Sequence, residues 1–257
     1  MANLLWLVKM GSVVIDPYVT DWLNLLVRWF HILVGAAWIG TSLYFKWLNN
    51  SLRHDEDMPE DVGGEVWSVH GGGFYQVRKY KVAPKMMLGM LHWFEWEACL
   101  TWVSGICLVG LVYYLGADVY LTDPSVAQLT SGQALGLGSL VLGWFIYDGL
   151  CKTSALFAGV ALTLGALEAF GYSEVFSARG AYIHVGALLG TCMAANVFFV
   201  IIPGQRAMVT AMNTGFAPDP EKGNAGALRS LHNNYMTLPV LFIMVSNYYP
   251  MTYGTIP

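Results

Sequence analysis

Histidines are the residues of this 257-residue chain best suited to chemistry, because imidazole can transfer protons near neutral pH and can ligate a metal ion. The chain has six of them: His31, His54, His70, His92, His184 and His232. Three lie inside long apolar runs, namely His31, His92 and His184. An ionisable side chain at membrane depth costs about 2.5 kcal/mol or more, so each of these three is a functional candidate.

Two of the histidines have small residues on the helix face that they would share. His31 lies about ten residues into the first apolar run, roughly 15 Å deep at 1.5 Å per residue, with Gly35 one turn further on. His184 is flanked on its face by Gly180 and Ala187. This pattern favours axial ligation of heme iron, because a porphyrin must approach the helix closely. The alternative is that the small residues serve helix packing and each histidine bonds a neighbour.

His92 is followed at +3 and +7 by Glu95 and Cys99, which would share one helix face with it. His92 and Glu95 could therefore ligate a metal together. A di-iron site needs further carboxylates and paired Glu-x-x-His motifs, but only Asp148 and Glu168 are other acidic residues well inside apolar runs. A di-iron centre is not favoured, and a role for His92 at the membrane interface is the alternative.

His70 precedes three glycines in a segment that alternates apolar and polar residues, VWSVHGGGFYQVRKYKV. Such alternation around glycines predicts a β-hairpin or a folded loop. The backbone amides of Gly71 and Gly72 can approach a ligand closely, or the glycines can form a turn with positive φ. His70 is thus a candidate site residue, and a loop histidine without a task is the alternative.

His232 begins the string HNNYMTLP at the start of the last apolar run. With Asn233 and Asn234 it supplies donors and acceptors that suit a planar heterocycle carrying carbonyl and NH groups. The alternative is that one of these three side chains caps the start of a helix.

Composition defines the setting in which these residues must work. The chain is 56% hydrophobic and only 12% charged, with a mean hydropathy of +0.50, and a soluble domain carries about twice that charged fraction. Much of the surface must therefore face membrane lipid. A net charge of -4 gives no reason to expect a nucleic-acid partner. None of the four cysteines forms a CxxC or CxxCH motif, so neither a disulfide framework nor a c-type heme attachment is supported.

Six apolar runs approach the roughly 20 residues that a membrane-crossing helix needs. They cover residues 22–48, 86–115, 133–150, 154–170, 178–202 and 233–249. The third and fourth are short and closely linked, which predicts a helical hairpin, and the second is long enough to be tilted or to project from the membrane. The expected fold is all-α: a polytopic bundle of about six transmembrane helices in a single integral membrane domain, residues 1–257.

Charge in the connections predicts the orientation of the bundle. The first link, 49–85, and the fifth, 203–230, carry several Lys and Arg residues, and the third carries Lys152. The second link has no Lys or Arg, and the fourth has only Arg179. The positive-inside rule then places the odd-numbered links, including the long loop with the expected β-hairpin, in the cytoplasm, and both termini outside.

Five strings in this chain resemble one known family. In order, they are HILVGAAWIGTSLYF, VHGGGFYQVRKY, LHWFEWEACLTWVSG, IHVGALLGTCMAANVFFVIIPGQR and HNNYMTLPVLFIMVSNYYP. Together they resemble the membrane domain of bacterial membrane-bound urate hydroxylases, the cytochrome c-linked urate oxidases of purine catabolism, from about Trp22 to the end. The resemblance implies a multi-pass protein of the bacterial inner membrane that oxidises urate to 5-hydroxyisourate and passes electrons through heme to a c-type cytochrome.

Two departures from the family pattern accompany this resemblance. Members of the family continue into further membrane spans and a C-terminal cytochrome c domain, whereas this sequence contains no CxxCH. We therefore expect the c-type heme on a separate chain or on a domain absent from this one. The family also has a histidine within SNxYP, where this chain has Tyr248.

The leading hypothesis is a heme b-containing oxidoreductase that takes up urate from the cytoplasm. Its site residues would be His70, His92, Glu95 and His232 for catalysis, Asn233, Asn234, Gly71 and Gly72 for substrate binding, and His31 and His184 for heme. A second hypothesis, which Tyr248 favours, is a heme-binding electron-transfer or anchoring subunit of a larger respiratory complex without urate activity. A third is a transporter or structural subunit, because intramembrane histidines also serve proton relays.

Overall fold

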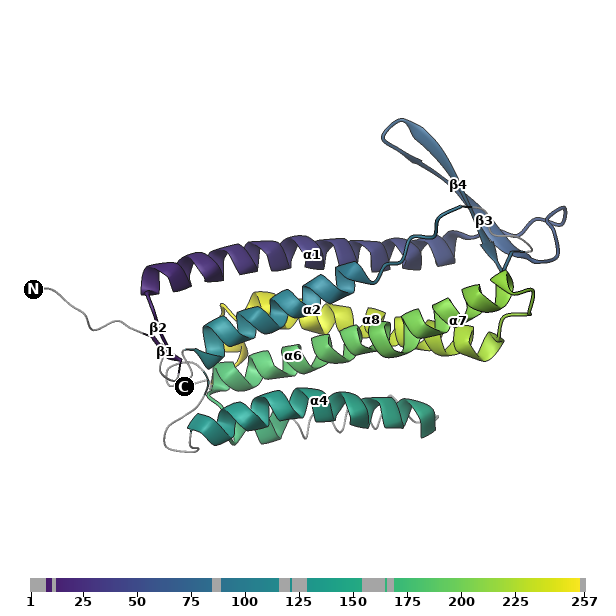
Figure 1. The fold of residues 1–257 in the computed structure, drawn as a ribbon. Coiled ribbons are helices and arrows are strands. Elements are labelled where there is room, and N and C mark those ends of the chain that lie inside the picture. The colour runs from purple at the N-terminus through teal and green to yellow at the C-terminus, as the bar shows by residue number, and fades with distance from the viewer. Residues whose placement is uncertain are drawn as a thin grey trace, which may run out of the picture.

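The computed structural model describes residues 8–10, 13–84, 89–115, 121, 129–153, 165 and 169–254. These form a bundle of long helices that run side by side, with one β-hairpin projecting from an end (Figure 1). At the opposite end, two short antiparallel strands, β1 (Val8–Met10) and β2 (Val13–Ile15), precede the first helix.

Helix α1 (Pro17–Ser51) is 35 residues long and lies at the edge of the bundle. It begins where Asp16 accepts a hydrogen bond from the backbone N–H of Tyr18 at 2.8 Å, and proline at the first helical position suits a start because its missing N–H has no helical partner there. Only three residues of the described helix are buried, namely His31, Gly35 and Leu48. Most of its large apolar side chains are exposed, as expected of a helix in contact with lipid, although Trp38 packs against the core residues Ala98, Val197 and Ile202.

The expected β-hairpin is confirmed. Strands β3 (Val62–His70) and β4 (Gly73–Tyr80) pair antiparallel and are joined by Gly71 and Gly72. The φ angles of these glycines are +57° and +82°, in the left-handed region that other residues rarely adopt. The glycine string therefore makes the tight turn that reverses the chain.

Helix α2 (Trp96–Val109) continues into a π-helical turn, η1 (Gly110–Tyr114). The predicted second run began at residue 86, but residues 89–95 are not helical, and 85–88 lie outside the described part. Gly89 has φ of +93°, which no right-handed helix can include. The helix that can cross the membrane is accordingly shorter than expected, residues 96–114.

Helix α4 (Leu129–Thr153) confirms the third predicted run. The fourth, 154–170, lies almost wholly outside the described residues, so neither that span nor the expected helical hairpin can be compared.

Helix α6 (Ala178–Asn196), the π-turn η2 (Val197–Ile201) and α7 (Ile202–Asn213) form one continuous helical run. The run passes Pro203, where the sequence predicted a link, because the π-turn immediately before it absorbs the irregularity that proline introduces.

The last helix, α8 (Pro220–Ser246), begins 13 residues before the predicted sixth run. Asp219 caps its start by accepting from the N–H of Glu221 at 2.9 Å. Most of the predicted fifth link is therefore helix. Neither His232 nor the asparagines after it cap this helix, because all three lie well inside it.

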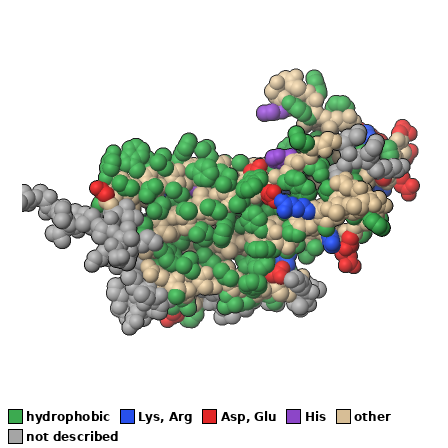
Figure 2. Space-filling view, viewed as in Figure 1, with side chains coloured by type: hydrophobic (Ala, Val, Ile, Leu, Met, Phe, Trp, Pro, Cys, Tyr) green, Lys and Arg blue, Asp and Glu red, His purple; other side chains and the backbone are tan. Residues whose placement is uncertain are grey.

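By length and composition, four helical segments of the described chain could cross a membrane: 17–51, 96–114, 133–151 and 178–213. They are consistent with a helical membrane protein. Helix α8 is not among these four segments. The orientation of the bundle in the membrane stays a prediction. In the most apolar stretch of the segment 178–213, 56% of the residues are buried, whereas in the corresponding stretch of α1 only 6% are. Helix α6 therefore forms the centre of the bundle, where it packs on α2, α4 and α8. On the face shown in Figure 2, charged side chains gather mainly at the hairpin end and hydrophobic ones over the helices.

Candidate functional site

An ion pair between α8 and α4 lies buried in the bundle. Arg229, 4% exposed, donates from Nη2 to Oδ1 of Asp148 at 2.5 Å and from Nη1 to Oδ1 of Asn196 on α6 at 3.3 Å. Either charge alone would be costly to bury, whereas together they neutralise each other. Arg229 thus ties three helices together through one side chain.

Two amides extend this arrangement. Asn196, fully buried, donates from Nδ2 to the hydroxyl of Tyr147 and to Oδ1 of Asn233, each at 2.9 Å. Asn233 in turn donates from Nδ2 to the carbonyl of Met193 at 3.0 Å. Because Asn233 follows Arg229 by four residues, one face of α8 presents both side chains to α6.

His232 completes what we call the polar cluster: Tyr147, Asp148, Asn196, Arg229, His232 and Asn233. The Tyr147 hydroxyl lies 2.9 Å from Nδ1 of His232 and, since it accepts from Asn196, has its proton available for that nitrogen. Burial and then the Arg229 charge lower the pKa of His232. The ring is therefore neutral at physiological pH and able to accept a proton.

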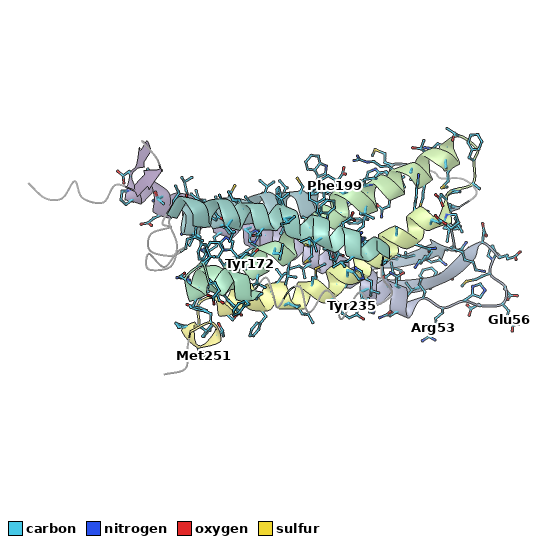
Figure 3. The ribbon with its side chains drawn as sticks, turned by 90° about the horizontal axis from the view of Figure 1, so that it is seen from below. Arg53, Glu56, Tyr172, Phe199, Tyr235 and Met251 are labelled. Carbon is cyan, nitrogen blue, oxygen red and sulfur yellow. The ribbon has the colours of Figure 1, made fainter. Side chains whose placement is uncertain are left out.

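A partly open hollow of about 510 Å³ adjoins the polar cluster, and Asp148 and Arg229 form part of its wall. Trp144 and Phe199, whose ring centroids are 4.9 Å apart, and Lys222 also line it. Phe199 lies at the edge of the bundle (Figure 3). The indole N–H of Trp144 is buried and has no hydrogen-bond partner among the described residues. The hollow therefore offers an aromatic wall and a positive charge.

A second cluster, nearer the start of α6, surrounds the fully buried imidazole of His184. We call it the His184 cluster: Tyr114, Gly136, Phe176, Gly180 and His184. Nδ1 of His184 donates to the carbonyl of Gly180 at 2.8 Å, so Nε2 is the acceptor for the Tyr114 hydroxyl at 3.0 Å. Phe176 stacks on the imidazole with centroids 4.5 Å apart. A methyl group at Gly136 on α4 would come within 2.9 Å of Nε2, so α4 packs directly against the histidine.

His31 on α1 contacts α2 in a different way. Ser104 donates to the carbonyl of Leu100 at 2.6 Å and therefore accepts from Nδ1 of His31 at 2.9 Å. A methyl group at Gly105 would lie 3.1 Å from the imidazole, so a larger residue at this position would crowd the ring. The backbone of Thr101 on α2 also lies within hydrogen-bonding reach of the ring.

The two histidines fit heme differently. In both, Nδ1 is fixed by a hydrogen bond, the arrangement that leaves Nε2 to a metal. His31 fits an axial ligand better than His184, because the residues found against its ring, Thr101, Ser104 and Gly105, are small. At His184 the same position holds the Tyr114 hydroxyl and the α4 backbone, so a porphyrin there would require α4 to move. Heme ligation by either residue stays a prediction, and the geometry favours His31.

His92 and Glu95 precede α2, so they do not share a helix face as the sequence suggested. His92 is exposed, with Nε2 3.6 Å from a carboxylate oxygen of Glu97. Glu95 instead accepts from Nη2 of Arg206 on α7 at 2.7 and 2.9 Å. Each therefore has a polar partner of its own, and Glu95 links the start of α2 to α7.

The remaining predicted site residues make no described hydrogen bond to the polar cluster. His70, Gly71 and Gly72 are exposed at the turn of the β-hairpin. Asn234 is half-buried on α8 and makes no described side-chain hydrogen bond, unlike Asn233. Within the described ranges, no group of three or more His, Cys, Asp or Glu side chains is placed to hold a metal ion.

Sequence reasoning found two members of the polar cluster, His232 and Asn233, and missed the roles of Arg229, Asn196 and Tyr147. Asn196 carried a signal, because it is a lone amide in the apolar string AANVFFVII. Arg229 was assigned to a link, so its charge was read as a mark of orientation rather than as the partner of a buried carboxylate.

Comparison with known proteins adds one finding. A family model described as "Urate oxidase N-terminal" matches residues 17–256, from the start of α1 nearly to the end of the chain. No curated protein and no solved structure matches the chain. The match confirms the resemblance carried by the five sequence strings. Since it covers far more than half of the sequence, the chain belongs to the urate oxidase N-terminal family.

Proposed function

We propose that this chain is the membrane part of an oxidoreductase that converts urate to 5-hydroxyisourate and passes the electrons to a c-type cytochrome. Membership of the urate oxidase N-terminal family supports a urate-related function. The observation within the molecule that carries the proposal is the polar cluster, where amide, guanidinium, phenol and imidazole groups meet inside an otherwise apolar bundle. Intramembrane polar groups of this kind mark functional sites by default.

The hollow beside the polar cluster suits a flat anion with carbonyl groups. Urate is planar, is a monoanion near neutral pH, and carries carbonyl and NH groups around its edge. Lys222 supplies a positive charge for the anion. The Arg229–Asp148 pair has no net charge and does not supply one. Phe199 supplies an aromatic face for the ring.

The reaction adds water to urate and releases two electrons and two protons. Tyr147 and His232 can receive one proton: as the Tyr147 oxygen takes it, the phenol proton moves to Nδ1 of His232 across 2.9 Å. The Arg229 guanidinium lies over the Tyr147 ring, 5.0 Å from its centre, and helps to hold the phenol beside His232. A bound heme b would supply one-electron acceptance at iron, and His31 would hold it.

Several assignments remain predictions from the sequence. Catalytic roles for His70, His92 and Glu95, binding roles for Gly71, Gly72 and Asn234, heme ligation by His184 and a location in the bacterial inner membrane are all of this kind.

A second candidate function is an electron-transfer or anchoring subunit of a respiratory complex without urate activity. Tyr248, in place of the histidine expected from the family, favours it. Tyr248 is 58% exposed and accepts a hydrogen bond from Arg28, so this position forms a contact between α1 and the end of α8.

Stopped-flow absorbance of the heme-loaded complex with its cytochrome partner decides between the two functions. Urate should reduce the heme, and His232→Ala and Asn233→Ala should abolish this reduction while the heme remains bound. Asn224→Ala is the matched control, because Asn224 is an exposed asparagine on the same helix. A flat trace after urate is added to fully loaded wild-type protein would remove the urate assignment and leave the electron-transfer subunit.

A further inference from the structure

We propose that the end of the β3–β4 hairpin inserts into the lipid–water interface beside α1 and anchors this end of the protein to the bilayer surface. The proposal depends on the bundle lying in a membrane and is independent of urate chemistry and of which membrane face this end occupies.

The hairpin carries large apolar side chains on one face near its turn. The register pairs Val69 with Phe74 and Trp67 with Gln76, and side chains two residues apart on a strand point to the same face. Trp67, Val69 and Phe74 therefore share a face, and their exposed fractions are 61%, 64% and 77%. We call these three residues the hairpin tip. No other described element covers them, although an isolated hairpin in water gains stability from burying such a face.

The base of the hairpin is held firmly at the end of α1. The backbones of Arg53 and Glu65 exchange two hydrogen bonds of 2.9 Å. Lys79 donates from Nζ to Oδ1 of Asn49 on the last turn of α1 at 2.6 Å. On the hairpin itself, Arg78 pairs with Glu65 at 3.0 Å. These contacts give the hairpin a fixed starting point relative to the lipid-facing helix.

The direction of the hairpin brings its tip toward the bilayer. It runs sideways from the end of α1, and its turn leans back along the length of the bundle (Figure 1, Figure 3). From Glu65 to His70 the strand reaches about 17 Å at roughly 3.3 Å per residue. The tip therefore lies out beside α1, over the ring of lipid that surrounds the helices, instead of extending straight into water.

Side chains on α1 and on the hairpin indicate the level of the interface. Tyr44 and Trp47, exposed near the end of α1, are of the type that gathers where lipid head groups meet the acyl chains. Trp67 and Phe74 continue this aromatic belt outward from the bundle. Exposed aromatic and apolar side chains at the tip are what insertion into the interface requires.

Quenching of Trp67 by brominated lipid tests the proposal. The full-length protein would be reconstituted in nanodiscs of anionic phospholipid, with acyl chains either plain or brominated close to the head group. The emission of Trp67 is the difference between the protein and its Trp67→Phe variant. We expect this difference emission to lose most of its intensity in the brominated bilayer, and the loss to shrink when Phe74→Glu places a charge at the hairpin tip. Ser68→Glu, on the opposite face at the same height, should leave the quenching unchanged.

Two results would overturn the anchor. Equal Trp67 emission in both bilayers, together with strong quenching by acrylamide in water, would mean that the tip stays in solvent. Protection from acrylamide without quenching by bromine would mean that protein covers the tip, as in contact with a second copy of this chain. Because neither readout involves urate or heme, the anchor and the urate reaction can fail independently.

Discussion

Helix α6 carries two buried polar regions that differ in kind. The His184 cluster at one end consists of neutral groups, an imidazole held between a carbonyl and a phenol and covered by Phe176. The polar cluster, where Asn196 lies twelve residues further along and so about 18 Å away, includes the full charges of Arg229 and Asp148. Both lie among apolar helices, but only one contains charge.

The difference shows two ways in which an apolar bundle keeps polar groups. A neutral histidine needs only hydrogen-bond partners and close packing. The contribution of the His184 cluster to protein stability therefore depends on how well the neighbouring side chains fit around the ring. A buried charge needs its counter-ion, so removing one partner is far more damaging than removing both. We expect mutations in the two regions to differ in size and in how they can be rescued.

The largest effect should follow from breaking the ion pair. Asp148→Ala leaves Arg229 buried without a counter-ion and should lower the free energy of unfolding by about 3–5 kcal/mol. The double variant Asp148→Leu/Arg229→Met should recover most of that loss, because the replacements are apolar. Thermal unfolding in detergent measures both. Glu65→Ala, which breaks an exposed pair with Arg78, should change stability by about 0–1 kcal/mol. An Asp148→Ala variant as stable as the control would contradict the prediction.

Packing around His184 should respond next most strongly. Gly136→Ala places a methyl group against Nε2 of His184 and the Tyr114 hydroxyl, and such overpacking costs about 1–3 kcal/mol. Gly138→Ala, two residues along the same helix, meets nothing within 4 Å. It should raise stability by about 0.5–1 kcal/mol, because alanine favours helix over glycine. Paired melting curves should therefore shift in opposite directions, and shifts of the same sign would refute the close contact.

Removing one neutral hydrogen bond should have a smaller effect. Tyr114→Phe deletes the hydroxyl that donates to His184 and should cost about 0.5–1.5 kcal/mol. Tyr235→Phe is the control, since Tyr235 is 73% exposed and points away from the bundle (Figure 3). If both variants unfold at the same temperature as the parent, the Tyr114–His184 bond contributes nothing measurable.

The smallest expected effect is a pH dependence that distinguishes the polar cluster from its surroundings. The pKa of His232 is lowered in the folded state, mainly by burial. The unfolded chain, with an imidazole pKa near about 6.5, then binds more protons as pH falls, so stability decreases below that pH and is unaffected well above it. His232→Gln should make the decrease shallower. A decrease as steep in the variant as in the parent would assign it to other groups.

Local pattern was sufficient for several features. The low charge and long apolar runs predicted a helical membrane protein, and α1 and α4 follow the predicted runs closely. Alternation around three glycines predicted the β-hairpin, because strand period and turn chemistry are local properties. The boundaries of α2 and α8 were wrong for equally physical reasons. Gly89 adopts a left-handed backbone that hydropathy does not register, and the polar first half of α8 carries no apolar signal.

The candidate site was only partly readable from the sequence. Residue type and the family strings singled out His232 and Asn233, because amide and imidazole groups beside an apolar run are conspicuous. That Arg229 lies against Asp148 and Asn196 was decided by tertiary structure alone. Those residues come from three helices, and which side chains meet depends on the rotation and packing of each helix against the others. Sequence alone determined the membrane bundle, the hairpin and the family, which depend on local pattern; the polar cluster depends on contacts between segments up to 81 residues apart.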